Sequence, residues 1–494
     1  MDTITHGIAG ALLGKAFCGG DSMFPVKPMT RSRIITWALM LGAVFPDSDI
    51  FRDMVSRDPL LIITWHRSYT HSLLLLPLFA LTLAGATRWV ARKLGWDGPS
   101  YAALVGVYAI GIASHILLDL VTTFGTMVWS PLSWSRPAWD LVFIVDFTLT
   151  GVLLIPQLLA WVHRDEPHAK RRAVTMWMLF VPVTFGIAAI GKTVGAPISN
   201  AAIGGAMAIF SVLFLVPAVF GWGSRLRLAT WNRAGFSLAC VYVALTVVAH
   251  HKALQRVKKF AEFQGVHPEI IGALPFPPSL WNWDGLIRTA RGVYELRMDL
   301  SQPPIVPTSE AEAAAALIVP LTYNYFPDAP TNPWIRQARQ LPEVQKVLWF
   351  DRFPVTRFHK EGEESVVEIL DLRFAKVRPD RPASFTYRVR FDADGRVLAQ
   401  GWVRECGANK RPLPVRLRQK IVANRAEGER AGGRLGLCAG CVHAQQVRSS
   451  KGSTFLLCGR SKSDSSFPKY PRLPVLACRG YQKADRARTS EERA

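Results

Sequence analysis

Long apolar segments in the first half of the chain limit its fold more than any other feature. The clearest of them, Asn200 to Gly223, contains no Asp, Glu, Lys or Arg. A helix needs roughly 20 predominantly apolar residues to cross the hydrocarbon core of a membrane. The candidate spans are residues 34–50, 68–87, 99–121, 141–162, 173–191, 200–223 and 234–250. The sequence therefore predicts an all-α polytopic membrane domain over residues 1–251.

Basic residues recur in every second connection between these spans. They lie in residues 27–33, 88–93, 164–172 and 225–233. Because cytoplasmic loops are enriched in Lys and Arg, these connections are expected to face the cytoplasm. The first segment, Met1 to Phe17, has no basic region before it, so we expect a retained helix rather than a cleaved signal peptide. The pattern indicates a multi-pass protein of the bacterial inner (cytoplasmic) membrane.

A soluble α+β domain is predicted over residues 252–406. Its expected strands are rich in β-branched and aromatic residues and lie in Val293–Leu300, Val347–Phe350, Ser365–Phe374 and Ser384–Phe391. The alternation of the loops would place this domain in the periplasm, whereas the basic run from Lys252 to Lys259 favours the cytoplasm. We expect residues 260–494 to be cytoplasmic, with segment 234–250 entering and leaving the membrane on the same side.

The end of the chain carries a separate signal. Residues 407–435 form a basic linker, and residues 436–484 a tail with four cysteines, Cys438, Cys441, Cys458 and Cys478. Four thiolates, opened by a CxxC pair, can close a structural zinc or iron-sulfur site. In an oxidising compartment the same residues can form two disulfides instead. We favour the metal, because so small a domain has little core of its own.

The formal net charge of +22 raises the question of nucleic acid. Much of this charge lies in short loops between spans and in the region after residue 404. Such clusters orient membrane proteins or contact anionic lipid. Membrane lipids are therefore the expected partners, and nucleic acid is not.

Seven ionisable side chains lie in or beside the apolar segments of the first 120 residues. They are His6, Asp47, Asp49, His66, His71, His115 and Asp119. Taken singly, each histidine is better explained as a hydrogen-bonded interfacial residue. Together they are hard to explain as packing, because each buried carboxylate needs a cation or a proton. Imidazoles and carboxylates suit zinc or a similar divalent ion, so all seven are predicted metal ligands.

Two catalytic roles follow from this hypothesis. A bound ion lowers the pKa of a water, and the resulting hydroxide attacks a phosphorus or carbonyl centre. Asp47 or Asp49 is the expected proton acceptor. Arg67 has a planar fork that can hold a phosphate oxygen. An arginine that anchors the end of a span at the interface explains the same position equally well.

Four short blocks carry a resemblance to a known family. They are Thr5-His6-Gly7, Phe45-Pro46-Asp47-Ser48-Asp49, His66-Arg67-Ser68-Tyr69-Thr70-His71-Ser72-Leu73 and Ser114-His115-Ile116-Leu117-Leu118-Asp119. In this order they resemble the bacterial inner-membrane metal-dependent hydrolases of the LexA-regulated type, a family remotely similar to zinc-dependent phospholipase C and P1-type nucleases. The tail resembles small CxxC bacterial proteins.

The resemblance implies a membrane-bound metal-dependent hydrolase that acts on a phosphoester or lipid-linked substrate. A non-enzymatic membrane metal-binding protein or a transporter is the alternative, since histidine and aspartate in spans also mark ion pathways. A transporter should show symmetry between its halves. Here the candidate ligands crowd into residues 1–119 and have no counterpart in residues 141–250, which favours the hydrolase.

Overall fold

The structure is a computed structural model. It describes residues 1–19, 30–56, 58–193, 198–302, 322–374, 385–403, 419–420, 441–448, 454–462 and a few single positions up to residue 482. Residues 1–420 form one compact unit and residues 421–494 a second.

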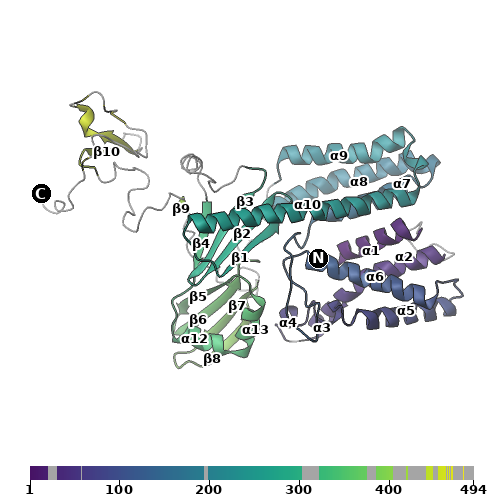
Figure 1. The fold of residues 1–494 in the computed structure, drawn as a ribbon, viewed down its shortest axis with the longest axis horizontal. Helices are drawn as coiled ribbons and strands as arrows, with labels where there is room; N and C mark the ends of the chain where they lie inside the picture. The colour runs from purple at the N-terminus through teal and green to yellow at the C-terminus, as the bar shows by residue number, and fades with distance from the viewer. Residues whose placement is uncertain are drawn as a thin grey trace. The chain divides into compact units, whose positions relative to one another are not determined.

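The first part of the larger unit is helical, as the sequence predicts (Figure 1). Its elements are α1 (Thr3–Phe17), α2 (Arg31–Val44), η1 (Phe45–Asp49), α3 (Ile50–Val55), α4 (Leu61–Thr64), η2 (Tyr69–His71), α5 (Leu76–Lys93), α6 (Tyr101–Leu120), α7 (Phe147–Val162), α8 (Glu166–Thr193), α9 (Asn200–Val219), η3 (Gly223–Arg225) and α10 (Leu228–Phe263).

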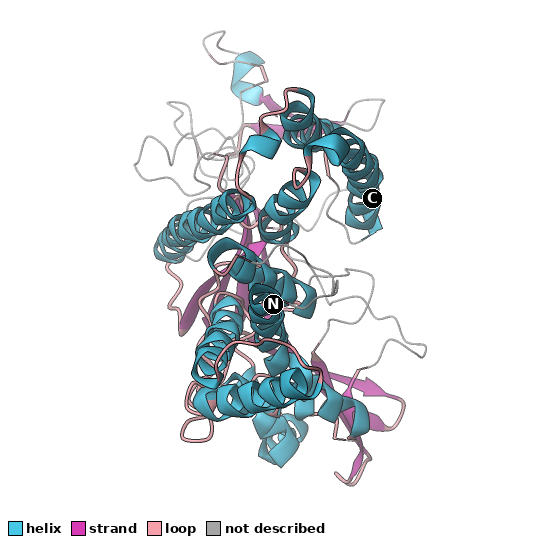
Figure 2. Cartoon of the chain, turned by 90° about the vertical axis from the view of Figure 1, so that its right-hand side faces the viewer, coloured by secondary structure: helices cyan, strands magenta, loops and turns pink. Residues whose placement is uncertain are grey.

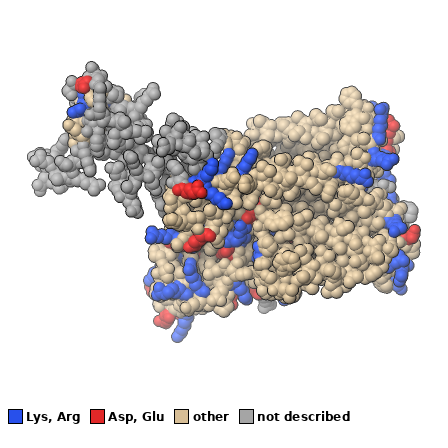
Figure 3. Space-filling model, in the orientation of Figure 1, with Lys and Arg blue, Asp and Glu red and all other residues tan. Residues whose placement is uncertain are grey.

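Five helical segments among the described residues are long and apolar enough to cross a membrane. They are Arg31–Arg52, Tyr101–Leu120, Glu166–Lys192, Asn200–Val219 and Leu228–Glu262. A sixth is possible if Leu61–His71 and Leu76–Lys93, which are bent by 70° relative to each other, count as one broken span. Figure 3 shows a broad helical surface almost free of charged side chains, with Lys and Arg gathered at one end. This distribution is that of a membrane-spanning bundle.

Close approach of the backbones brings α1, α2 and α6 together. A Cβ added at Gly10 of α1 would lie 2.7 Å from the carbonyl oxygen of Leu39, and one at Gly111 of α6 would lie 2.8 Å from the same oxygen. Small residues at such crossings allow helices in membranes to pack tightly. The three helices that carry His6, Asp47 and His115 are therefore held side by side.

The second part of the larger unit consists of two antiparallel sheets, seen beyond the helix ends in Figure 2. One sheet has the order β1-β2-β3-β4-β9 and the other the order β5-β6-β7-β8. Their strands are β1 (Ile270–Phe276), β2 (Asn282–Thr289), β3 (Gly292–Asp299), β4 (Thr322–Pro327), β5 (Pro354–Glu361), β6 (Glu364–Asp371), β7 (Thr386–Phe391), β8 (Val397–Trp402) and β9 (Gln419–Lys420). Helices α12 (Pro333–Gln340) and α13 (Pro342–Phe350) pack on the second sheet. Residues 270–402 are called the β domain below.

Three of the four expected strands of this region are present, and one prediction is wrong. Val293–Leu300, Ser365–Phe374 and Ser384–Phe391 correspond to β3, β6 and β7, whereas Val347–Phe350 belongs to helix α13. Pro342 begins this helix, and Val344, Val347 and Phe350 are buried at helical spacing. Their β-branched and aromatic character is therefore explained by packing of one helical face and not by strand pairing.

The prediction that segment 234–250 enters and leaves on the same side is also wrong. Helix α10 is continuous over its 36 residues, which at 1.5 Å per residue is about 54 Å, well beyond the roughly 30 Å of the hydrocarbon core. The expected domain boundary at residue 251 falls inside this helix, and the first strand begins only at Ile270.

The four basic connections lie at one end of the helices, and the candidate ligands and the β domain lie at the other. The chain turns at the basic end after α1, between α5 and α6, between α7 and α8, and between α9 and α10. Contacts between the loop after α6 and the β domain, given below, place both on one side of the membrane. The β domain therefore does not lie on the side opposite the ligands, as the cytoplasmic placement of residues 260–494 required.

In the smaller unit the structure describes a two-stranded hairpin of β10 (Ala444–Arg448) and β11 (Thr454–Cys458), followed by the turn η5 (Gly459–Lys462). Cys441 and Cys458 are free and half-buried. Cys438, Cys478 and most of the predicted linker 407–435 lie outside the described residues. The metal site of the tail thus stays a prediction.

Candidate metal centre

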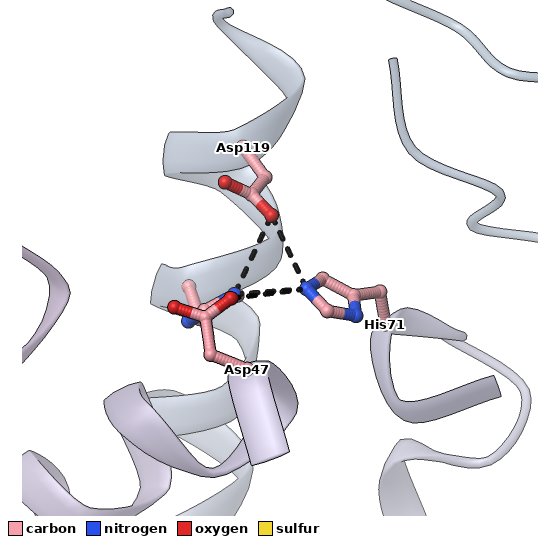
Figure 4. Close-up of side chains that lie close together, drawn as sticks. Asp47, His71 and Asp119 are labelled. Carbon is pink, nitrogen blue, oxygen red and sulfur yellow. Dashed lines mark hydrogen bonds and ion pairs between the residues drawn. The ribbon is translucent and has the colours of Figure 1, made fainter. Parts of the chain in front are cut away.

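Four of the seven candidate ligands converge at one end of the helices. Asp47 comes from the 3-10 turn η1 that ends α2, His71 from η2, and His115 and Asp119 from one face of α6. One nitrogen or oxygen of each lies within 4.8 Å of those of the other three, and all four residues are buried. Figure 4 shows Asp47, His71 and Asp119 pointing toward one another from three separate elements.

The distances within the cluster fit a small divalent ion. Asp119 Oδ2 lies 3.2 Å from His71 Nε2 and 3.4 Å from His115 Nε2. Asp47 Oδ1 lies 3.8 and 3.5 Å from the same two nitrogens, which are 3.0 Å apart. In a tetrahedral zinc site with bonds of about 2.0 Å, neighbouring ligand atoms lie about 3.3 Å apart. The donor set and its spacing therefore suit such an ion.

Hydrogen bonds at the far side of each ring turn both imidazoles toward the cluster. His115 Nδ1 donates to the carbonyl oxygen of Ala43 at 2.6 Å. His71 Nδ1 lies 3.4 Å from Asp49 Oδ2 and 3.0 Å from Thr70 Oγ1. With Nδ1 protonated, each Nε2 presents a lone pair, as in metal-bound histidines held by an outer partner. Two lone pairs and two carboxylate oxygens then face one another, and they need a cation or a proton between them.

The second oxygen of Asp119 is surrounded by positive groups. Asp119 Oδ1 lies 2.9 Å from Arg67 Nη2 and 3.2 Å from His6 Nε2, and it also accepts from the amino group of Met1. These contacts occupy Oδ1 and leave Oδ2 toward the two histidines. Asp119 is therefore oriented before any ion binds.

Arg67 is engaged within the protein. Besides Asp119, its guanidinium donates to Thr122 Oγ1 at 3.0 Å, and the side chain is almost fully buried. Its backbone has a φ of 62°, a left-handed conformation that is uncommon outside glycine and is often found at functional sites. In this arrangement Arg67 supports Asp119, and it has no free fork for a phosphate.

His6, His66 and Asp49 lie next to the four-residue cluster and not within it. The His6 ring stacks on that of His115 with centroids 3.6 Å apart. Asp49 accepts from His66 Nδ1 at 2.9 Å with one oxygen, and from the Arg67 backbone N–H at 3.0 Å with the other. The hydroxyl of Thr70 also donates to Asp49, at 3.2 Å. Asp49 thus links two histidines instead of pointing at the cluster.

Several partners of the site were not recognised from the sequence. The hydroxyl of Thr3 donates to Asp47 Oδ2 at 2.5 Å, and the Ala43 carbonyl orients His115. Arg136 donates to backbone oxygens of Ile63, His66 and Gly125. Burial and the neighbouring Arg67 lower the pKa of Arg136 to about 9, so it stays charged at neutral pH. A threonine beside a candidate ligand was a usable signal, whereas contacts across the fold had none.

Asp146, without an assigned role in the sequence, holds elements together. It caps α7 by accepting from the backbone N–H groups of Thr148 and Leu149, and its other oxygen accepts from the hydroxyls of Tyr242 and Ser279 at 2.7 and 2.5 Å. These contacts join α7, α10 and the start of the β domain, and their role is structural.

Comparison with known proteins agrees with the membrane assignment. Residues 1–194 match the model of the family described as YdjM inner membrane protein, a range that contains all seven candidate ligands and stops before the β domain. Neither the curated proteins nor the solved structures include a match. No finding supports the remoter likeness to zinc-dependent phospholipase C or P1-type nucleases. The family match and the five apolar spans identify the chain as a multi-pass inner membrane protein.

Proposed function

We propose that Asp47, His71, His115 and Asp119 bind one divalent metal ion, with zinc the best fit, and that the protein is a membrane-embedded metal-dependent hydrolase. The observation that carries the proposal is the convergence of four acceptor atoms with no donor among them. An ion bound there supplies a nucleophile by lowering the pKa of a water toward neutrality.

His66 is the proposed proton acceptor. Its Nδ1 is held by Asp49, which leaves Nε2 as the basic nitrogen. The His66 side chain is 20% exposed, whereas those of His71 and His115 are fully buried. Asp49 is a weaker candidate than the sequence indicated, because both its oxygens already accept hydrogen bonds.

A lipid or lipid-linked phosphoester is the proposed substrate class. Asp47 is the least buried of the four ligands, and the exposed apolar residues Ile4, Ile50 and Phe51 lie close to it or to its partner Thr3 in sequence. Trp129 and Trp134 of the loop after α6 are also exposed. Tryptophan is enriched at the level of the lipid headgroups. An amphiphilic substrate would therefore meet the site without leaving the membrane surface.

The test compares three histidine variants of the full chain. His115→Gln should lose metal and hydrolysis together, whereas His66→Gln should keep the metal and lose hydrolysis. His168→Gln, an exposed histidine near the basic end of the helices, is the matched control. Metal is measured by elemental analysis, and activity on bis(p-nitrophenyl) phosphate and on phospholipid vesicles. Metal bound as expected but no hydrolysis of any substrate would favour the non-enzymatic alternative.

A further inference from the structure

The loop that follows α6, residues 121–146, lies between the metal centre and the β domain. Phe124 in this loop is buried, with its ring centroid 5.7 Å from that of His66 on one side. On the other side it packs against Phe350, Phe374 and Phe385 of the β domain, at centroid distances of 5.2, 6.0 and 6.1 Å. A single aromatic ring thus joins the two parts.

Polar contacts fix the same junction. Asp140 and Arg352 form a two-pronged ion pair with N to O distances of 2.9 and 2.8 Å, and Asp140 is buried. Arg373 donates to the Thr123 carbonyl at 3.1 Å. Bidentate arginine pairs define geometry more strictly than single contacts. The loop is therefore anchored to the β domain near both of its ends.

The loop also holds the segment that carries His66 and Arg67. The backbone N–H of Met127 donates to the Arg67 carbonyl at 2.9 Å. The Arg67 guanidinium carbon lies 5.1 Å from the centre of the Phe124 ring, a cation–π contact. Arg67 in turn holds Asp119 Oδ1. A continuous path of contacts therefore runs from Arg352 through the loop to a candidate metal ligand.

We infer that the β domain is a working part of the metal centre, in which Phe124, Asp140 and Arg352 are positioning residues that fix Arg67 against Asp119. This inference rests on the proposed metal site. It assigns a role to residues beyond the range that matches the family model, and it places the site and the β domain in one functional unit. Loss of an outer partner of a metal ligand costs about 10- to 100-fold in metal affinity, and we expect the lower figure here because the contact is indirect.

The experiment measures cobalt(II) binding by visible absorption in the full-length protein. Arg352→Ala and Phe124→Ala should each bind cobalt about tenfold more weakly than the wild type, with an altered spectrum. Exchange of the two charges, Asp140→Arg with Arg352→Asp, should recover most of the affinity. Arg388→Ala is the control, because it removes an ion pair to Glu368 inside the same sheet and should leave cobalt binding unchanged.

Arg352→Lys retains one of the two contacts and serves if the alanine variant does not fold; it should bind with intermediate affinity. Wild-type affinity in all the junction variants would overturn the inference alone. A loss as large in Arg388→Ala as in Arg352→Ala would overturn it too, because the effect would then be general destabilisation. Wild-type protein that binds no cobalt would overturn the proposed function itself.

Discussion

Replacement of Asp49 by asparagine separates an orienting role from a ligand role. Asp49 and Asp47 lie two residues apart in η1, yet only Asp47 points into the cluster. In Asp49→Asn one oxygen becomes an NH2 group. The remaining oxygen can keep the three donors that now share Oδ2, the Arg67 N–H, the Thr70 hydroxyl and His71 Nδ1. The NH2 group then faces His66, and the negative charge opposite His71 is lost.

The size of the effect follows from these contacts. Removal of an outer partner of a metal ligand costs about 10- to 100-fold in metal affinity, or about 1.4 to 2.7 kcal/mol. The His71 contact is long, at 3.4 Å, and the new oxygen can partly replace it. We therefore expect a loss near tenfold for Asp49→Asn. Asp47→Asn, which changes a direct ligand, should lose more than 100-fold.

Competition with a chromophoric chelator gives the affinity of each purified variant. Asp58→Asn is the control, because this carboxylate in the same region caps Leu60 and contacts no histidine among the described residues. Unchanged affinity in Asp49→Asn would refute the orienting role. A loss as complete as that of Asp47→Asn would show instead that Asp49 is a direct ligand, as the sequence alone suggested.

Three further results are expected. Removal of residues 421–494, the second compact unit, should leave the metal and hydrolysis of the membrane site intact; loss of both in a folded protein would show that the tail contributes. A reporter fused after residue 264 should be active in the periplasm, because α10 ends at the side opposite the basic loops; activity only in the cytoplasm would contradict this orientation. Asp351→Asn should raise the melting temperature at pH 7. Burial and the nearby Asp371 carboxylate hold the pKa of Asp351 well above its ordinary value, so ionisation of the unfolded chain above about pH 4 costs stability, which asparagine avoids; an equal gain at pH 3, where both states are protonated, would argue against this cause.

The sequence was most informative where a local pattern sufficed. Apolar length located most of the helices, and the i,i+4 spacing of His115 and Asp119 placed both on one face of α6. It could not tell which carboxylate of η1 would point into the cluster, because that depends on a 3-10 turn and on the distant donors Thr3 and His66.

Long-range packing decided the remaining features. The expected strand at Val347–Phe350 became a helix because its apolar residues face the second sheet. The charge of residues 252–259 pointed to the cytoplasm, yet α10 carries this run straight from the bundle to β1. The junction between Asp140 and Arg352 joins residues 212 positions apart, and no motif in one sequence marks such a pair.

The central claim is tested most directly by X-ray absorption at the edge of whichever metal copurifies with the full-length protein. The tail cysteines are first changed to serine (Cys438→Ser, Cys441→Ser, Cys458→Ser and Cys478→Ser), so that sulfur ligands there do not contribute. The account predicts one ion per chain with only nitrogen and oxygen neighbours at about 2.0 to 2.2 Å, and outer scattering from two imidazole rings that falls to one in His71→Gln. A protein without stoichiometric metal, or a spectrum unchanged by His71→Gln, would contradict it.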